Sequence, residues 1–255
     1  MNNPIEQFKE EVKQNIEKLG EDTQLRELSE QWFCKSMDDK YSYNFRWMGR
    51  PIIQYPQDIM AMQEIIWDVK PDLIIETGIA HGGSLIFYAS LLTLLGNHGH
   101  VLGIDIDIRE HNRTEIEHHP MFDKITMYEG SSIDKDMIQK VFEFAKDYQK
   151  ILVVLDSCHT GSHVLEECRL YSPLVKQGSY LVVMDTCSEM IYRRMKEANE
   201  ELPEHLVRPW KLGDNAMTGM QEFLKENDRF QIDTGIDHKL QISCAPNGYL
   251  QCIKD

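Results

Sequence analysis

Acidic or polar side chains close the apolar runs in the central part of this 255-residue chain. Such runs predict strands that are buried on both faces, and parallel strands bring their carboxyl ends to one edge of a sheet. We therefore expect these side chains to line a common pocket. They are Glu76, Asp105 with Asp107, the run Glu129–Ser132, Asp156 with His159, and Asp185.

A glycine-rich turn follows the first of these runs, in the sequence Glu76-Thr-Gly-Ile-Ala-His-Gly-Gly-Ser84. Glycine adopts positive φ and lets a ligand approach the backbone closely. A turn of this kind between a strand and a helix is where open α/β sheets bind nucleotide-like cofactors. The carboxylate of Glu76 would repel a bare phosphate, but it suits a ligand with hydroxyls or a cationic group.

Asp105 lies about twenty residues beyond this turn, where an acid accepts hydrogen bonds from the hydroxyls of an adenosine ribose. This spacing fits both NAD and S-adenosylmethionine. Two features favour S-adenosylmethionine: Ala80 stands where a dinucleotide-binding turn has its second glycine, and Glu76 would attract the methionine ammonium. The alternatives are an NAD-dependent oxidoreductase, or a non-catalytic binding protein on the same fold. The alternative role of Asp105 is to cap the N-terminus of a helix instead of binding the ribose.

Asp156 and Asp185 end adjacent central strands. Two such carboxylates can share a divalent cation such as Mg²⁺, which would lower the pKa of an acceptor hydroxyl. The alternative is that both only accept hydrogen bonds from loop amides. His159 is a candidate general base, because a neutral imidazole accepts a proton near pH 7. His81, in the glycine turn, is a candidate contact to the region of group transfer.

Strands and helices alternate after residue 58, which predicts a doubly wound α/β sheet. The expected strands are 72–77, 100–106, 124–128, 151–156, 179–185, 229–233 and 239–244. The expected helices are 58–69, 83–95, 109–118, 134–147, 161–171, 188–199 and 214–226. No crossover helix fits between the last two strands, so we expect them to form an antiparallel hairpin.

An N-terminal extension, residues 1–57, precedes this domain of residues 58–255. Apolar spacing predicts one or two helices over residues 4–36. Residues 41–56 are aromatic and contain two prolines and a glycine, which prevent a regular helix. This segment is either a lid over the pocket, a contact with a neighbouring subunit, or a segment packed onto the sheet.

The net charge of -15 argues against a protein that binds nucleic acid or an anionic membrane, because such a protein presents a basic face. No apolar run approaches the ~18 residues of a membrane span, and the first residues lack the basic and apolar regions of a signal peptide. The six cysteines show no CxxC pair and are expected to be reduced. These features predict a cytoplasmic protein.

Several long motifs over roughly residues 45–252 resemble the cephalosporin-hydroxylase-like family. They are WMGRPIIQYPQDIMAMQEIIWDVKPDLIIETGIAHGGS, VLGIDIDIR, EGSSID, VVLDSCHTGSHVLEECRLYSPLVKQGSYLVVMDT and APNGYL. Despite its label, this family looks like S-adenosylmethionine-dependent O-methyltransferases and is related to macrolide-sugar methyltransferases. The resemblance implies a class I methyltransferase fold, a Rossmann-like doubly wound sheet that ends in an antiparallel hairpin.

The turn and the resemblance together give an expected site. The cofactor residues are Glu76, Gly78, His81, Gly82, Ser84, Asp105, Asp107, Ser131, Ser132 and Asp156, with Ser131 and Ser132 near the adenine. By the same resemblance Asp156 and Asp185 correspond to metal-binding acids. His159 and Asp156 are the expected catalytic residues.

Two positions depart from the family pattern. The fifth strand often ends in Glu-Asp but here in Met184-Asp185, and the fourth-strand motif often reads Leu-Asp-Ser-Asp-His but here has Cys158 in place of the second acid. The loss of two acids weakens the metal site and gives His159 more weight as the base. It would also spare an anionic acceptor from repulsion.

The acceptor that the family suggests is a sugar hydroxyl of a small molecule or glycan precursor, and the two lost acids also allow a phosphoryl or carboxyl oxygen as the acceptor. We expect no nucleic-acid or membrane partner, and we expect a homo-oligomer.

Overall fold

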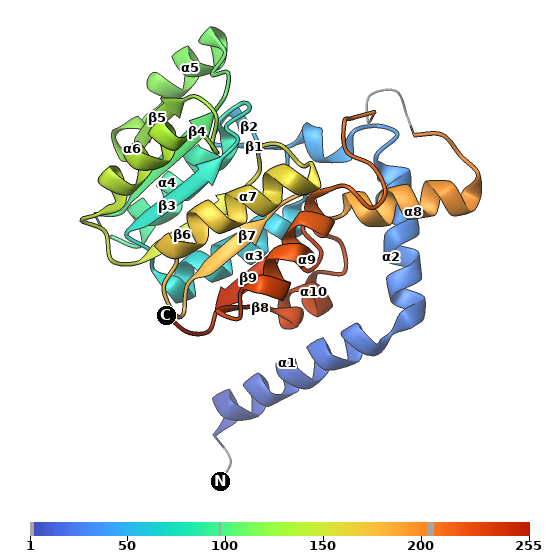
Figure 1. The fold of residues 1–255 in the computed structure, drawn as a ribbon. Helices are drawn as coiled ribbons and strands as arrows, with labels where there is room; N and C mark the ends of the chain where they lie inside the picture. Colours follow the sequence, from blue (N-terminus) through green and yellow to red (C-terminus); the bar gives the residue numbers. More distant parts are fainter. Residues whose placement is uncertain (1–2, 97, 203–206) are drawn as a thin grey trace.

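The large central sheet has the strand order β5-β4-β3-β6-β7-β9-β8 in the part of the chain that the structure describes (Figure 1). The structure, a computed structural model, describes residues 3–96, 98–202 and 207–255. The strands are β3 (Leu73–Thr77), β4 (His100–Asp105), β5 (Ile125–Glu129), β6 (Ile151–Leu155), β7 (Tyr180–Val183), β8 (Phe230–Ile232) and β9 (Tyr249–Cys252). Strands β3 to β7 are parallel, and β9 runs antiparallel to both β7 and β8. The predicted doubly wound sheet with an antiparallel edge is confirmed.

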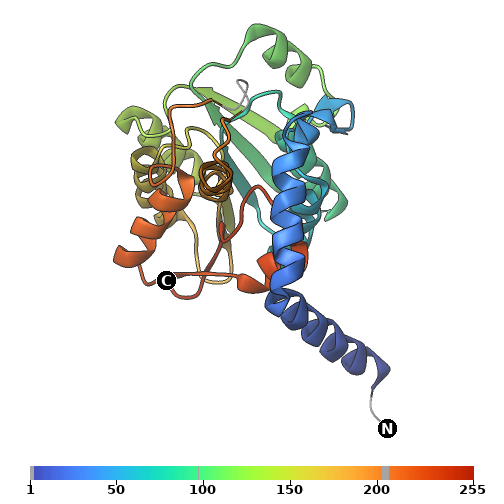
Figure 2. The same ribbon diagram turned by 90° about the vertical axis from the view of Figure 1, so that its right-hand side faces the viewer.

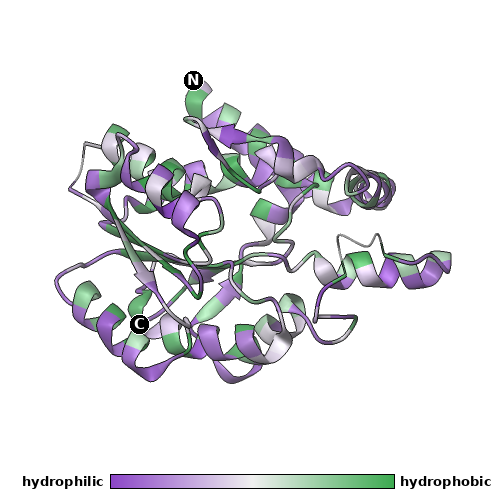
Figure 3. Ribbon diagram, turned by 90° about the horizontal axis from the view of Figure 1, so that it is seen from above, coloured by the Kyte–Doolittle hydropathy of each residue, from purple (hydrophilic) through white to green (hydrophobic). Residues whose placement is uncertain are grey.

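Helices cover both faces of this sheet (Figure 3). One layer contains α3 (Pro56–Val69), α4 (Gly83–Leu94) and α5 (Glu110–Glu117), and the other contains α6 (Lys135–Ala145), α7 (Gly161–Tyr171) and α9 (Ala216–Glu226). Every residue of β3 and β6 is buried, because both faces of these strands are covered. The helices end within about two residues of their predicted bounds, the normal scatter of helix ends.

The C-terminal hairpin differs from the prediction in its connection. The predicted strand over residues 239–244 is wrong: a short helix, α10 (Thr234–Leu240), follows β8, and the last strand is β9. The Asp233 side chain accepts a hydrogen bond from Gly235 N at 3.1 Å and so caps this helix. The alternation of Leu240 and Ile242 with polar residues looks like a strand, but only Tyr249–Cys252 finds a partner in β7.

The N-terminal extension forms two helices, as predicted. They are α1 (Pro4–Glu21) and α2 (Thr23–Ser36), and Asp22 between them accepts a hydrogen bond from Leu25 N at 2.9 Å. Helix α1 points away from the sheet, has no buried residue, and contacts α10 near its end (Figures 1 and 2). The irregular segment that follows contains a 3-10 turn (Tyr41–Asn44) and the two-residue strands β1 (Arg46–Trp47) and β2 (Arg50–Pro51). Among the described helices, none is long and apolar enough to cross a membrane.

A buried carboxylate, Asp58, joins helix α3 to the C-terminal loop. Its side chain is fully buried and accepts hydrogen bonds from Ser243 Oγ at 2.5 Å, Cys244 N at 2.9 Å and Tyr249 OH at 2.8 Å. Burial raises the pKa of Asp58 above its ordinary value, and these donors partly offset that effect. The sequence prediction treated Asp58 only as the start of a helix, because its partners lie about 190 residues away.

Replacement of Asp58 by Ala should destabilise the fold by about 3 kcal/mol or more, because it leaves several buried donors without an acceptor. Asp58→Asn, which keeps an acceptor oxygen, should cost less. The measurement is the free energy of unfolding in urea. Glu64→Ala on the same helix is the control: Glu64 forms a half-exposed pair with Lys239, and its loss should cost only about 1 kcal/mol. Equal losses for the two alanine variants would contradict this role of Asp58.

Candidate active site

Three cavities at the carboxyl edge of the sheet share Asp156 and Ala80 as lining residues. We call them the adenine-side cavity, because it contains Ser131 and Ser132, which are expected near the adenine; the Gln54 cavity, after its buried glutamine; and the aromatic cavity, after its tyrosines. Asp156 follows β6 in the middle of the sheet, so its carboxylate lies where the three spaces meet. A reaction that joins molecules from two of these cavities would take place beside Asp156.

The adenine-side cavity, of about 250 Å³, lies between the ends of β3, β4, β5 and β6. Its lining residues are Gly78, Ala80, Ile104, Asp105, Ile106, Gly130, Ser131, Ser132, Asp156, Ser157, Cys158 and His163. The structure therefore brings together five of the residues expected to bind the cofactor, namely Gly78, Asp105, Ser131, Ser132 and Asp156.

Asp105 holds the glycine-rich turn in place. One carboxylate oxygen accepts hydrogen bonds from Ile79 N at 2.7 Å and Ala80 N at 3.2 Å, and the other accepts from Asp107 N at 3.1 Å. Ala80 has a positive φ of 46°, so the turn adopts the left-handed backbone there without a glycine. Position 78, in contrast, requires a glycine, because a Cβ at Gly78 would lie 2.0 Å from the carbonyl oxygen of Asp156.

His163 is a residue of this cavity that the sequence prediction missed. Its Nε2 lies 3.1 Å from Ser132 Oγ, 3.3 Å from Ser157 Oγ and 3.5 Å from Glu167 Oε1. The Glu167 side chain is almost fully buried, and it accepts a hydrogen bond from Ser157 Oγ at 2.7 Å. His163 and Glu167 are four residues apart on helix α7, and this spacing was the signal available in the sequence.

The Gln54 cavity is small, about 40 Å³, and lies beside the glycine-rich turn. Ser84 and His81 line it together with Gln54, which is only 2% exposed. Among the described residues, neither polar atom of the Gln54 amide makes a hydrogen bond of normal geometry; its polar neighbour is the Tyr88 hydroxyl, which donates to Glu76. An unpaired buried amide costs about 1–3 kcal/mol, so this side chain is suited to a polar ligand that enters the cavity.

Glu76 lies behind the Gln54 cavity and is fully buried. Its carboxylate accepts hydrogen bonds from Ser84 Oγ at 2.5 Å and Tyr88 OH at 3.1 Å. Burial raises the pKa of Glu76 to about 8, and the two hydrogen bonds reduce that effect only in part. Glu76 is therefore linked to the Gln54 cavity by its hydrogen bond with Ser84, which lines that cavity. A cation placed nearby would favour the ionised form of Glu76.

Three other expected cofactor residues have structural contacts. Gly82, with φ 79°, precedes helix α4, and a Cβ there would meet the Ile116 side chain at 2.3 Å. The Asp107 side chain is 71% exposed and lies near Arg109. His81 lines the Gln54 cavity, but its Nδ1 is 3.3 Å from Asn112 Oδ1 and its carbonyl accepts two hydrogen bonds from Arg50.

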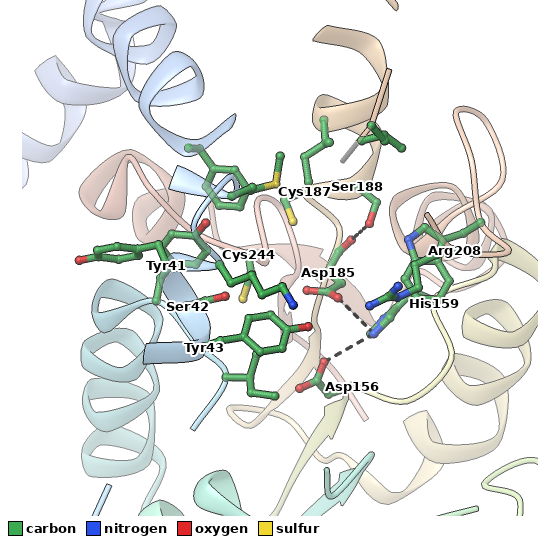
Figure 4. Close-up of a pocket in the computed structure, with 18 of the residues that line it drawn as sticks. Tyr41, Ser42, Tyr43, Asp156, His159, Asp185, Cys187, Ser188, Arg208 and Cys244 are labelled. Carbon is green, nitrogen blue, oxygen red and sulfur yellow. Dashed lines mark hydrogen bonds and ion pairs between the residues drawn. The ribbon is translucent and has the colours of Figure 1, made fainter. Parts of the chain in front are cut away.

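The aromatic cavity, of about 250 Å³, contains the candidate catalytic residues (Figure 4). His159 Nε2 lies 3.2 Å from Asp185 Oδ2 and 3.9 Å from Asp156 Oδ1. Asp185 has a positive φ of 56°, a backbone conformation that Asp adopts more readily than most residues. Tyr41, Tyr43, Tyr55 and Trp210 form much of the wall, and Trp210 contacts the His159 ring edge-on.

Asp156 and Asp185 repel each other at the bottom of this cavity. The pKa of Asp156 is raised well above its ordinary value, first by burial and then by the charge of Asp185. The Asp156 side chain still has 28% exposure toward the cavity space. In its ionised form this carboxylate is therefore a stronger base than a surface aspartate, and it can then accept a proton from a bound hydroxyl.

The same cluster fits a divalent cation. Asp156, His159 and Asp185 each offer one ligand atom, and these atoms lie within 4.8 Å of one another. Two carboxylates suit Mg²⁺, whereas the imidazole is more typical of transition metals.

The two residues that depart from the family pattern lie apart from each other. Met184 is buried in the core, and Cys158 lines the adenine-side cavity. The departure at Cys158 therefore alters the cofactor side more than the acid pair.

The buried Glu76 predicts a specific pH dependence of stability. Its pKa is about 8 in the folded protein and near the ordinary 4.5 in the unfolded chain. The folded state keeps this proton between those values, so the free energy of unfolding falls as the pH rises from about 5 to about 8 and then levels off. The contribution of Glu76 is on the order of a few kcal/mol.

Urea unfolding of the ligand-free protein at several pH values measures this effect, with Glu76→Gln as the comparison. The stability of the wild type relative to Glu76→Gln should decrease toward pH 8. A difference between the two proteins that is constant over this range would contradict a protonated, buried Glu76.

Comparison with known proteins shows the family. A family model described as Rhamnosyl O-methyltransferase/CmcI matches residues 39–253. The rhamnosyl O-methyltransferase of Mycobacterium bovis (strain BCG / Pasteur 1173P2) is 28% identical over 212 residues, which are 80% of this chain and 76% of that protein. The rhamnosyl O-methyltransferase of Mycobacterium leprae (strain TN) is 27% identical over 206 residues, 80% of this chain and 81% of that protein.

Solved structures share the fold. An apo structure of CmcI superimposes with a TM-score of 0.57 at 18% identity, covering 84% of this chain and 78% of CmcI. An O-methyltransferase from Bacillus cereus, in complex with SAH, superimposes with a TM-score of 0.51 at 14% identity and covers 91% of both chains. The class I methyltransferase fold that the sequence motifs imply is confirmed.

Proposed function

The chain belongs to the Rhamnosyl O-methyltransferase/CmcI family and is an S-adenosylmethionine-dependent O-methyltransferase, and from this premise we propose that it methylates a hydroxyl of a sugar in a small molecule or glycan precursor. The main support for this proposal is that the three cavities meet at Asp156. The cofactor would occupy the adenine-side and Gln54 cavities, and the acceptor would occupy the aromatic cavity. The oxidoreductase alternative is not favoured, because the matched family consists of methyltransferases.

The cofactor binds, in this proposal, along the edge from β5 to β3. Asp105 accepts hydrogen bonds from the ribose hydroxyls, and Ser131, Ser132 and His163 face the adenine. The methionine end lies near Ser84 and Gln54, where an amide can donate to the carboxylate and accept from the ammonium. We assign Gly82 and Asp107 to the shape of the turn rather than to contact with the cofactor.

Glu76 contributes a negative charge behind the methionine end. Its ionisation becomes more favourable when a cation lies nearby, so cofactor binding should release a proton below pH 8. His81 stays a candidate contact, since it lines the Gln54 cavity while its ring approaches Asn112.

The transfer step requires an acceptor oxygen in line with the methyl group, and S-adenosylmethionine supplies that group on a sulfonium centre. The aromatic cavity orients the acceptor, which is the larger part of the catalysis. The cluster of Asp156, His159 and Asp185 takes the proton of the acceptor hydroxyl. Asp156 and Asp185 would also hold Mg²⁺, which would supply a Lewis acid at the acceptor oxygen.

The assembly and the compartment belong to the same proposal. Helix α1 exposes Ile5, Phe8 and Val12 in one row, with 65%, 65% and 38% of their surfaces accessible. This row suits packing against a second copy of the chain, in a homo-oligomer. The six cysteines are free thiols, which supports a cytoplasmic protein, and the net charge of -15 supports a protein without a nucleic-acid partner.

Gln54→Met tests the cofactor site. The substitution removes the unpaired buried amide, so the ligand-free protein should keep or gain stability, while the dissociation constant for S-adenosylhomocysteine should rise about tenfold or more. Calorimetry gives the affinity and thermal unfolding gives the stability. Gln57→Met is the matched control: Gln57 Oε1 is also buried without a partner, but the side chain does not line the three cavities.

The wild type should bind S-adenosylhomocysteine with micromolar affinity and show no comparable affinity for NADH. An unchanged affinity in Gln54→Met would contradict the placement of the methionine end. Preferential binding of NADH would contradict the proposed function itself.

A further inference from the structure

Two basic side chains, Lys40 and Arg208, stand at the mouth of the aromatic cavity. Lys40 immediately precedes the 3-10 turn of the N-terminal extension and has a positive φ of 51°. Arg208 belongs to the connection between α8 and α9. Figure 4 shows Arg208 across the cavity from Tyr41, Ser42 and Tyr43, the residues that follow Lys40 in the chain.

Both side chains lack an acidic partner among the described residues. Lys40 Nζ lies over the ring of Tyr43, 6.0 Å from the ring centroid. Arg208 Nη1 donates a hydrogen bond to the carbonyl of Val207 at 3.0 Å. The chain has 42 acidic and 27 basic residues, and the arginines on the adjacent helix α8, Arg193 and Arg194, both pair with glutamates. The overall charge therefore does not explain why two basic groups lining a cavity have no acidic partner in the part of the chain that the structure describes.

The acids inside the cavity do not pair with these groups. Asp156 and Asp185 lie at its bottom, where their nearest described cationic or protonatable partner is His159. The cavity thus has a negative bottom, which suits a hydroxyl that must lose a proton, and a positive mouth. Aromatic side chains form the wall between them, and such surfaces pack well against the apolar face of a sugar ring.

We propose that the acceptor is an anionic sugar, whose carboxylate or phosphate is bound by Lys40 and Arg208 while its hydroxyl faces Asp156. This inference rests on the proposed function and adds the substrate class. Guanidinium and ammonium groups are the usual partners of carboxylate and phosphate oxygens. A cavity of about 250 Å³ accommodates one sugar ring with such a substituent. The neutral rhamnosyl group named for the relatives would leave both basic groups unused.

The test uses the full chain saturated with S-adenosylhomocysteine and titrates three probes in the calorimeter: D-glucose, D-glucuronate and D-glucose 6-phosphate. At low salt, one or both anionic probes should bind about tenfold more tightly than glucose. The preference should shrink at high salt, because both basic side chains are exposed and their interactions are screened. The two anionic probes distinguish a carboxylate from a phosphate.

The double variant Lys40→Gln, Arg208→Gln should lose this preference while its affinity for S-adenosylhomocysteine is unchanged. The control Lys35→Gln, Arg193→Gln removes two charges that pair with Asp38 and Glu30 outside the cavity, and it should keep the preference. Equal binding of all probes, absence of binding by every probe, or a preference retained by the double variant would overturn the anionic acceptor.

Methyl transfer from labelled S-adenosylmethionine separates this inference from the proposed function. If a neutral sugar is methylated as fast as an anionic one, in both the wild type and the double variant, the function stands and the anionic acceptor is wrong. If anionic probes bind preferentially but no sugar is methylated, the anion site stands and the proposed function is wrong.

Discussion

The repulsion between two carboxylates, Asp156 and Asp185, sets the chemistry of this site. Both follow adjacent parallel strands, and burial together with their proximity raises the pKa of Asp156. Such a pair is stable only with a proton, an imidazole or a cation nearby. His159 Nε2, 3.2 Å from Asp185, is the partner that this chain itself provides. An imidazole or a cation leaves the Asp156 carboxylate free to take a proton from a hydroxyl, whereas a proton on the pair occupies it.

The remaining site residues determine what reaches this pair. Asp105 fixes the turn that separates the adenine-side cavity from the Gln54 cavity, and the N-terminal extension contributes the wall of the aromatic cavity. The extension is thus more than a contact surface, because Tyr41, Tyr43 and Tyr55 line the space that the acceptor would use. The irregular backbone of this segment follows from its prolines and glycine. It lets several aromatic side chains turn toward one cavity.

The sheet and the strand-end acids could be predicted from sequence because they depend on local patterns: continuous apolar runs, a glycine-rich turn, and polar residues at strand ends. The predicted strand over residues 239–244 failed because a local alternation of Leu240 and Ile242 gave no information about which segment pairs with β7. Gln54 and Asp58 were missed for the same reason. Their importance lies in burial and in partners, or missing partners, that are distant in sequence.

The most direct test of Asp156 as the proton acceptor is the kinetic effect of Asp156→Asn, which keeps the shape of the side chain but removes the carboxylate. We expect kcat to fall by about a hundredfold or more, because the substitution removes a proton acceptor from the transfer step. The dissociation constant for S-adenosylhomocysteine should change much less than kcat, by less than about tenfold, although Asp156 also lines the two cavities assigned to the cofactor. An unchanged kcat, or a loss confined to cofactor affinity, would contradict the claim that the transfer step takes place at Asp156.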